Sequence, residues 1–231
     1  MKRILIYIIS FLFCHTSISQ NKIDLLNKGN SFYKDGQFKD AEIYYKKALD
    51  KDPAYYKANL NLGHSLFKQS IELIGDSVGI EKLGEAEKFY SNSLRLTKNK
   101  EEKAESYYNL GNSQLLNQKL EKSIESYKNS LRLSPNNMST KHNLALAQSL
   151  LNQQQSNKEN KEEKDEKDEE KESESEKDQD KGEKKENDTE EKLTQEQIEE
   201  ILQALERKEE EVQEELQEKK ALNQDNLLKD W

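Results

Sequence analysis

One arrangement of small and aromatic residues occurs three times in the first 137 residues of this chain. In its first copy, Gly29 is followed by Ala41, Tyr45 and Ala48, and Pro53 closes the segment. The matching residues of the other two copies are Gly63, Ala86, Tyr90 and Ser93, and then Gly111, Ser123, Tyr127, Ser130 and Pro135. A glycine and small residues let two helices approach closely around one aromatic side chain, and a proline cannot continue the second helix. Each copy therefore predicts a helix–turn–helix that stacks on the next.

The spacing of the glycines identifies the repeat. Gly63 follows Gly29 by 34 residues, and Gly111 follows Gly63 by a further 48. A period of about 34 residues with this pattern is that of the tetratricopeptide repeat. The sequence therefore predicts an all-α superhelix, because stacked repeats bury a continuous core that no single repeat has. We expect repeats over residues 22–55, 56–103 and 104–137 and a capping helix over 138–153, within a repeat domain of residues 20–155.

The second repeat holds about eleven additional residues, which lie within residues 70–87 and include Gly75, Gly79 and Gly84. The expected shape is a lengthened first helix, a loop and a lengthened second helix. One interpretation is a tolerated surface loop, and the other is a contact for a specific partner.

The N-terminus has the pattern of an export signal. Lys2 and Arg3 precede a ten-residue apolar run over residues 4–13, and Ser17 and Ser19 supply a small-residue cleavage site. This predicts a secretory signal peptide over residues 1–19 and export of the mature chain. The alternatives are an uncleaved anchor, although a bilayer span needs about 20 apolar residues, and a lipoprotein processed at Cys14, although bulky Phe13 precedes it. Cleavage would remove the only cysteine, so the mature chain would have no disulfide.

The composition changes abruptly at Ser156. Residues 156–192 contain no aliphatic or aromatic side chain and hold ten lysines against eighteen Asp and Glu, a net charge of about −8 out of −9 for the whole chain. A segment that cannot bury apolar surface is predicted to be a disordered linker. Binding of cations or basic partners is the alternative.

Helical periodicity returns after the linker, over residues 193–222, and a tail over 223–231 follows. Thr194 and Gln197 have the spacing of a capping box at the helix start. A predicted partner-helix face consists of Ile198, Ile201, Leu202, Leu205, Val212 and Leu216, together with Trp231 at the chain end. Such a narrow apolar stripe needs a partner surface to be stable, and an isolated charged helix is the alternative.

Asparagines recur in phase with the glycines, as Asn27, Asn61, Asn109 and Asn143. In a tetratricopeptide stack this position faces the concave groove. A side-chain amide can donate to a peptide carbonyl and accept from a peptide N–H, so a row of amides could hold an extended chain by its backbone. Inherited duplication of a common repeat string is the alternative. The predicted peptide-binding groove also includes Asn30, Tyr33, His64, Phe67, Asn112 and Leu115.

Catalysis is not expected. The mature chain has two histidines, His64 and His142, and it has no thiol, glycine-rich phosphate loop or metal-ligand spacing. We predict no catalytic residue, no metal site, no cofactor, no membrane span after signal cleavage and no nucleic-acid partner.

The order of these segments resembles one family. A signal peptide, tetratricopeptide repeats, a charged spacer, a helix reading EEILQALERKEEEVQEELQEKK and a terminal KDW are similar to the BatC proteins of the Bacteroides aerotolerance (Bat) operons. The resemblance implies an exported, non-enzymatic adaptor. Its partners would be membrane-anchored von Willebrand factor A-type proteins of the same operon, in oxidative-stress tolerance. It implies no catalytic residue.

A second resemblance concerns the carboxylate-clamp repeat domains, which hold chain ends. Asn30 and Asn61 match positions of that clamp, but Leu26 and Glu105 stand where its lysines are expected. Capture of a C-terminal carboxylate is therefore not expected. Two rival hypotheses remain for the terminal helix, which could fold back on the repeat groove as an autoinhibitor or could join copies of the chain.

Overall fold

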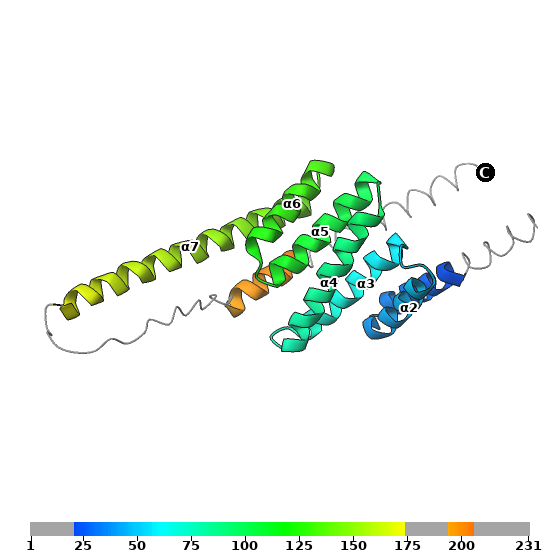
Figure 1. Ribbon diagram of the computed structural model, residues 1–231, viewed down its shortest axis with the longest axis horizontal. Helices are drawn as coiled ribbons and strands as arrows, with labels where there is room; N and C mark the ends of the chain where they lie inside the picture. The colour runs from blue at the N-terminus through cyan, green and yellow to red at the C-terminus, as the bar shows by residue number, and fades with distance from the viewer. Residues whose placement is uncertain (1–20, 174–193, 206–231) are drawn as a thin grey trace, which may run out of the picture. The chain divides into compact units, whose positions relative to one another are not determined.

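The computed structural model describes residues 21–173 and 194–205, and helices make up nearly all of them (Figure 1). The described residues contain no strand, which confirms the all-α class. The predicted signal peptide, residues 174–193 of the linker and everything after residue 205 lie outside the described residues. None of the described helices is long and apolar enough to cross a bilayer.

Two helices make up each repeat, and consecutive helices pack side by side from α2 to α6. The chain forms two compact units, one ending at Lys141 and the other beginning at His142, and each is described by itself. The helices are a first helix over residues 21–34, α2 (Phe38–Lys51), α3 (Tyr56–Glu72), α4 (Ser77–Leu96), α5 (Lys100–Leu116), α6 (Leu120–Leu133), α7 (Met138–Ser173) and a C-terminal helix over residues 195–205.

Each repeat glycine makes room for the tyrosine of the second helix of its repeat. The three tyrosine rings are at most 1% exposed. A Cβ atom on Gly29, Gly63 or Gly111 would lie 2.5, 2.7 or 2.6 Å from Cε1 of Tyr45, Tyr90 or Tyr127, respectively. Because real Cβ atoms essentially never show contacts under 3.0 Å, only glycine fits at this position. The predicted close approach is confirmed in all three repeats.

Small residues on the second helices complete this packing. Where serine replaces alanine, its hydroxyl finds an acceptor: Ser130 Oγ donates to the carbonyl of Ala104 at 2.8 Å, and Ser93 Oγ lies 2.8 Å from Ser106 Oγ. Buried hydroxyls are tolerated when they are hydrogen-bonded. The predicted small positions, Ala41, Ala48, Ala86, Ser93, Ser123 and Ser130, are all at most 1% exposed.

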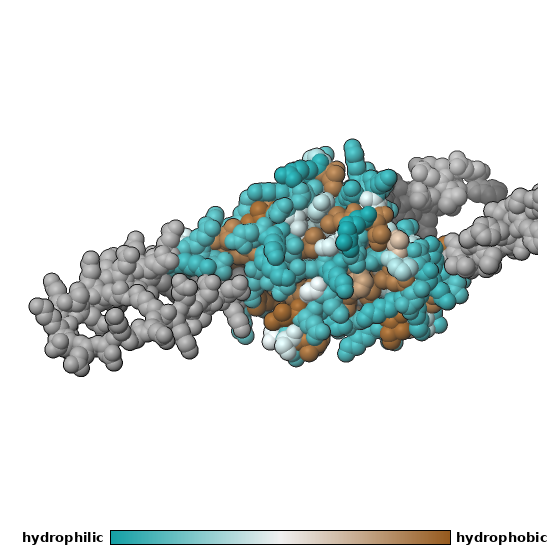
Figure 2. All heavy atoms as spheres, in the orientation of Figure 1, coloured by the Kyte–Doolittle hydropathy of each residue, from teal (hydrophilic) through white to brown (hydrophobic). Residues whose placement is uncertain are grey.

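The additional residues of the second repeat lengthen both of its helices. Aligned on the glycine–tyrosine pairs, α3 ends four residues later than α5, and α4 begins six residues earlier than α6. Gly75 turns the chain between α3 and α4 with a φ of +87°. The structure therefore has the expected lengthened hairpin. Its tip exposes Ile74, Val78 and Ile80, and on the face that Figure 2 shows, such apolar patches interrupt a mostly hydrophilic surface.

Helix α7 is much longer than the sequence predicts. The sequence predicts that it ends near residue 153 and that a disordered linker begins at residue 156, but the helix continues to Ser173. The linker prediction is therefore wrong for residues 156–173. Glutamate and lysine are strong helix formers, so a helix that has already begun can extend through them without burying an apolar face. The absence of a core excludes tertiary packing but does not exclude a helix.

Candidate peptide-binding face

Asn30 lies at the centre of a hydrogen-bond network that joins the first helix, α2 and α3. Its Oδ1 accepts from the hydroxyl of Tyr45 at 2.9 Å and from Nδ2 of Asn61 at 2.8 Å. Because two donors meet this oxygen, the amide of Asn30 is oriented with its NH₂ group pointing away from both. Asn61 uses its Nδ2 in this network and presents its Oδ1. The first helix thus offers the NH₂ group of Asn30 as a donor, and α3 offers Oδ1 of Asn61 as an acceptor.

The third repeat contains the same elements. The hydroxyl of Tyr127 donates to Oδ1 of Asn112 at 2.9 Å, as Tyr45 does to Asn30. Asn109, the equivalent of Asn61, donates from Nδ2 to the carbonyl of Glu105 in its own helix at 2.9 Å, so its Oδ1 is again the atom presented. We call the half-buried side chains of Asn30, Asn61 and Asn109 the amide face.

The second repeat departs from this pattern because His64 stands where Asn30 and Asn112 stand. The ring of His64 meets the ring of Tyr90 edge-on at 5.5 Å and the ring of Tyr33 edge-on at 6.5 Å. Tyr33 and His64 are half-buried. The structure therefore brings these two predicted groove residues together beside the amides, where they form an aromatic surface.

The other predicted groove residues divide by burial. Asn27 is exposed and Phe67 is half-buried. Leu115 and Asn143 are 0% exposed and Asn112 is 6% exposed, so these three side chains lie in the core and offer no surface to a ligand in this conformation. Sequence reasoning also missed the tyrosine hydroxyls that orient the asparagines. The signal was present, because a spacing of 15 residues separates both Asn30 from Tyr45 and Asn112 from Tyr127.

Burial keeps the tyrosine hydroxyls protonated. It raises the pKa of Tyr45 well above its ordinary value and that of the fully buried Tyr90 likewise. Burial also raises the pKa of Tyr56 to about 12, and its hydroxyl donates to the carbonyl of Glu102 at 3.0 Å. The Tyr45 phenol is therefore a permanent donor at neutral pH, and the orientation of Asn30 does not change with physiological pH.

The electrostatics of the face do not favour a terminal carboxylate. Leu26 is 5% exposed and belongs to the core, and Glu105 is exposed and acidic. These are the two positions at which the clamp-type domains are expected to carry lysines. Among the described residues, no three histidine, cysteine, aspartate or glutamate side chains are grouped so that they could hold a metal ion.

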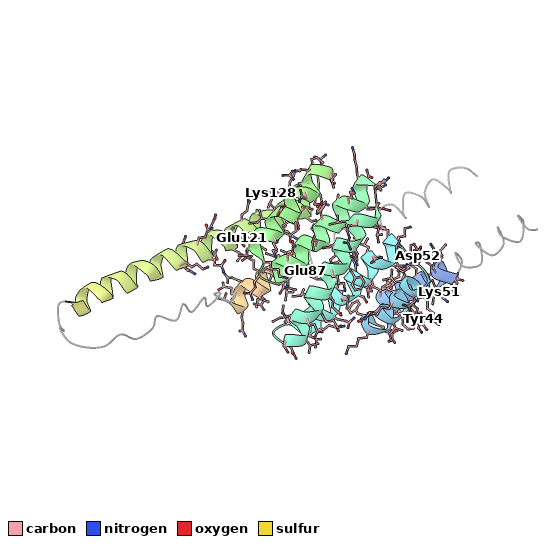
Figure 3. The ribbon with its side chains drawn as sticks, viewed as in Figure 1. Tyr44, Lys51, Asp52, Glu87, Glu121 and Lys128 are labelled. Atoms are coloured by element: carbon pink, nitrogen blue, oxygen red, sulfur yellow. The ribbon has the colours of Figure 1, made fainter. Side chains whose placement is uncertain are left out.

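Two polar contacts hold the repeats in register, and we call each of them a latch. In the first latch, Glu42 on α2 accepts from Nε2 of Gln69 at 2.7 Å and from Nζ of Lys82 at 3.3 Å. In the second, Glu87 on α4 accepts from Nδ2 of Asn117 at 2.7 Å and from Nζ of Lys119 at 2.8 Å. The three residues of the first latch and the three residues of the second latch occupy equivalent positions, one repeat apart. Figure 3 labels Glu87 where it reaches towards the α5–α6 turn.

The carboxylate of Glu42 is stabilised in its charged form. Burial alone would raise its pKa, but hydrogen bonds from Lys46 and Gln69 and the charge of Lys82 outweigh burial and hold the pKa below its ordinary value. A charge-assisted network of this kind fixes the spacing of the first helix pair against the next. It therefore also fixes the spacing of the asparagines that the helices carry.

The C-terminal helix belongs to the second compact unit together with α7 from His142 onward. Its predicted capping box is confirmed: Oγ1 of Thr194 accepts from the backbone N–H of Gln197 at 3.3 Å, and Oε1 of Gln197 accepts from that of Thr194 at 2.9 Å. Of the predicted partner-helix face, Ile201 is 0% and Leu205 8% exposed, and Ile198 and Leu202 are half-buried. Val212, Leu216 and Trp231 lie outside the described residues.

Two models of the tetratricopeptide repeat family match residues 24–55 and 104–137. The chain therefore contains tetratricopeptide repeats. A comparison with curated proteins finds no match. The matched ranges correspond to the first and third repeats, and the lengthened second repeat lies between them.

Solved structures of other tetratricopeptide repeat proteins are similar to this one. The first such domain of Spaghetti (RPAP3), bound to the HSP90 peptide SRMEEVD, is 26% identical over 58% of this chain and 94% of that chain, with a TM-score of 0.50. The C-terminal repeat domain of a Plasmodium falciparum FK506-binding protein is 22% identical over 60% and 93%, with a TM-score of 0.50. The second human RPAP3 domain, in complex with the HSP70 peptide SGPTIEEVD, is 20% identical over 57% and 98%, with a TM-score of 0.49. Tetratricopeptide domains mediate protein–protein interaction.

Proposed function

We propose that the repeats bind an extended segment of a partner protein through the amide face and that the chain acts as a non-enzymatic adaptor. The observation that carries this proposal is that Oδ1 of Asn30 accepts two hydrogen bonds. Tyr45 and Asn61 hold its oxygen inward, so its NH₂ group and the Oδ1 of Asn61 are oriented before any ligand arrives. Pre-orientation lowers the entropy that binding costs.

A peptide backbone matches this arrangement. A peptide carbonyl accepts from Nδ2 of Asn30, and a neighbouring peptide N–H donates to Oδ1 of Asn61. Each hydrogen bond contributes only about 0.5–1.5 kcal/mol net. The aromatic surface of Tyr33 and His64, with Phe67, supplies the apolar contacts that useful affinity requires. The 26% identity to a repeat domain solved with a peptide supports this function.

The biological setting is proposed from the resemblance to the BatC proteins. In this proposal the chain is exported to the periplasm and associates with the inner membrane through von Willebrand factor A-type partners in an envelope complex. The complex would contribute to oxidative-stress tolerance. The signal-peptide pattern of residues 1–19 supports export.

A second candidate function is an autoinhibited or self-associating scaffold, whose terminal helix docks on its own repeat groove or joins copies of the chain. One observation favours docking within the chain: the described part of the C-terminal helix forms one compact unit with α7, and Ile201, Ala204 and Leu205 are buried. Because α7 from His142 onward carries none of the amide face, this observation does not favour autoinhibition of that face.

The test of the amide face uses Asn30→Asp. Aspartate keeps an oxygen for Tyr45 and Asn61 but replaces the outward donor by an acceptor, so it repels a peptide carbonyl. Asn92→Asp is the matched control, because Asn92 is half-buried on α4 and its Oδ1 accepts only locally, from Arg95. Both variants and the wild type are used to capture proteins from an envelope extract, and circular dichroism checks their folding.

Quantitative mass spectrometry of the captured proteins gives the result. We expect a set of proteins that Asn92→Asp retains and Asn30→Asp loses at least about tenfold, which corresponds to about 1.4 kcal/mol. If Asn30→Asp folds and retains the full set, the amide face is not the binding site. Recovery of von Willebrand factor A-type proteins in the lost set would support the envelope complex, and their absence would leave the peptide-binding function but remove that setting.

A further inference from the structure

The described part of the C-terminal helix, residues 195–205, has one buried face. Ile201, Ala204 and Leu205 are 0%, 3% and 8% exposed. These residues follow the i, i+3, i+4 spacing of one helix face. A surface within the folded chain therefore covers that face.

Helix α7 identifies the surface. Nε2 of Gln197 donates to Oε1 of Gln153 at 3.0 Å, which places the start of the C-terminal helix beside α7. Gln153 shares a helix face with Leu150 and Leu146, which lie three and seven residues before it. Leu150 is 1% and Leu146 7% exposed.

The burial pattern also gives the direction of the C-terminal helix. If the two helices run antiparallel, the contact between Gln197 and Gln153 brings Ile201 level with Leu150, since four residues of helix rise about 6 Å. If they run parallel, Ile201 meets the exposed Asn157 instead. A fully buried isoleucine fits the antiparallel direction.

The contact is not a fourth copy of the repeat packing. Ala145 of α7 is the sequence equivalent of Gly111 in α5. Gly111 faces α6, the second helix of its repeat. Gly111 is buried, whereas Ala145 is exposed. The C-terminal helix therefore uses the α7 face of Leu146, Leu150 and Gln153 and leaves the Ala145 face open.

We propose that this α7 face is a binding site for a short amphipathic helix and that the chain's own residues 195–205 occupy it as an exchangeable ligand. The contact rests on a few apolar side chains and one amide pair, and its ligand is covalently tethered through residues 174–193. A tether raises the effective concentration of a weak ligand to the millimolar range, so the site stays filled in cis. An external helix with the same apolar spacing must outcompete it. This site does not depend on the amide face.

The first test uses the full chain with Ile201→Asp, which puts a charge into the buried contact. Gln203→Asp is the control, because Gln203 lies on the exposed side of the same helix. Hydrogen exchange is measured for residues 146–153 and 195–205. We expect Ile201→Asp to speed exchange in both segments at least about tenfold and Gln203→Asp to leave both near wild type. Unchanged exchange in both segments with Ile201→Asp overturns the proposal.

The second test measures refilling of the vacated site. A fluorescein-labelled peptide of residues 194–205 is titrated into wild type, Ile201→Asp and Gln203→Asp. We expect the Ile201→Asp chain to bind the peptide about tenfold or more tightly than the other two, because its site is vacant. Equal weak binding to all three overturns the exchangeable site. A dimer mass of wild type in sedimentation, lost in Ile201→Asp, overturns the cis occupant in favour of exchange between copies. None of these readouts involves Asn30, so their failure is distinct from failure of the peptide-binding function.

Discussion

At the residue scale, Tyr45 connects the core to the surface. Its ring fills the space that Gly29 leaves, and its hydroxyl fixes the amide of Asn30. The same pair of contacts recurs at Tyr127, with Gly111 and Asn112. The packing that makes the repeat fold therefore also sets the orientation of the amide. A ligand contact on this face inherits its rigidity from the core.

Two glycines of the second repeat give a matched test of this packing. At Gly63 a Cβ would lie 2.7 Å from the buried ring of Tyr90, whereas at Gly84 it would meet nothing within 4 Å. Alanine is a better helix former than glycine by about 1 kcal/mol. We therefore expect Gly84→Ala to raise the free energy of unfolding by about 0.5–1 kcal/mol. Gly63→Ala should lower it by about 1–3 kcal/mol because overpacking outweighs the helix gain. Urea denaturation measures both, and a stabilised Gly63→Ala would contradict the proposed packing.

The residues that sequence reasoning placed correctly are those whose partners lie at a fixed local or repeated spacing. The glycine–tyrosine pairs and the capping box of Thr194 and Gln197 are of this kind. The repeat positions of Leu115 and Asn143 predict that they line the groove, yet both are fully buried. Burial depends on what packs over a side chain, and the repeat pattern of one position does not contain that information.

At the element scale, the hairpin of the second repeat is an addition that keeps the register of the fold. Lys82, within α4, and Lys119, at the N-cap of α6, are equivalent when the repeats are aligned on their tyrosines, and each joins a latch. The turns of the other repeats contain Gly36 and Gln118, at equivalent positions with φ of +72° and +59°. Ser70 has the same alignment position. Removing residues 71–81 and changing Ser70→Gly would therefore recreate the short turn.

We expect this shortened chain to fold with a free energy of unfolding within about 2 kcal/mol of wild type, because it preserves the latch between Glu42 and Lys82 and because loop length costs little. Removal of residues 71–80 is the control, since it shifts α4 by one residue and turns Lys82 away from the latch. Urea denaturation compares the two. If the in-register deletion is no more stable than the control, the hairpin is part of the core. Capture of partners by the folded deletion then separates a tolerated loop from a partner contact.

The length of α7 shows the limit of composition as a predictor of elements. The charge and missing apolar residues of residues 156–173 argue against a buried core, but they do not exclude a helix. The lengthened hairpin, in contrast, follows from counting residues between Gly63 and Tyr90. The number of residues between two positions that pack against each other limits the shape of the segment that joins them. The composition of a segment indicates only whether its side chains can be buried.

At the scale of the whole molecule, the latches determine how the repeats depend on one another. In a repeat array each unit contacts only its neighbours, so damage at one interface has a local effect. Glu42 and Glu87 are equivalent residues at two successive interfaces. The third repeat has Ile124 at this position, which carries no carboxylate.

The variants Glu42→Gln and Glu87→Gln make the same chemical change at two places in the array. Glu42→Gln weakens the attachment of the terminal repeat, so we expect hydrogen exchange to rise over residues 21–51 and to stay near wild type on α5 and α6. Glu87→Gln weakens the middle interface and should raise exchange on α5 and α6 instead. A loss of about 1–2 kcal/mol corresponds to a rise of about 5–30-fold. The same uniform rise in both variants would contradict nearest-neighbour coupling.

The effect of Glu42→Gln should also fade in acid. Because the pKa of Glu42 is lowered in the fold, its carboxylate stabilises the protein above its ordinary pKa, and this contribution is lost as the pH falls through the lowered value.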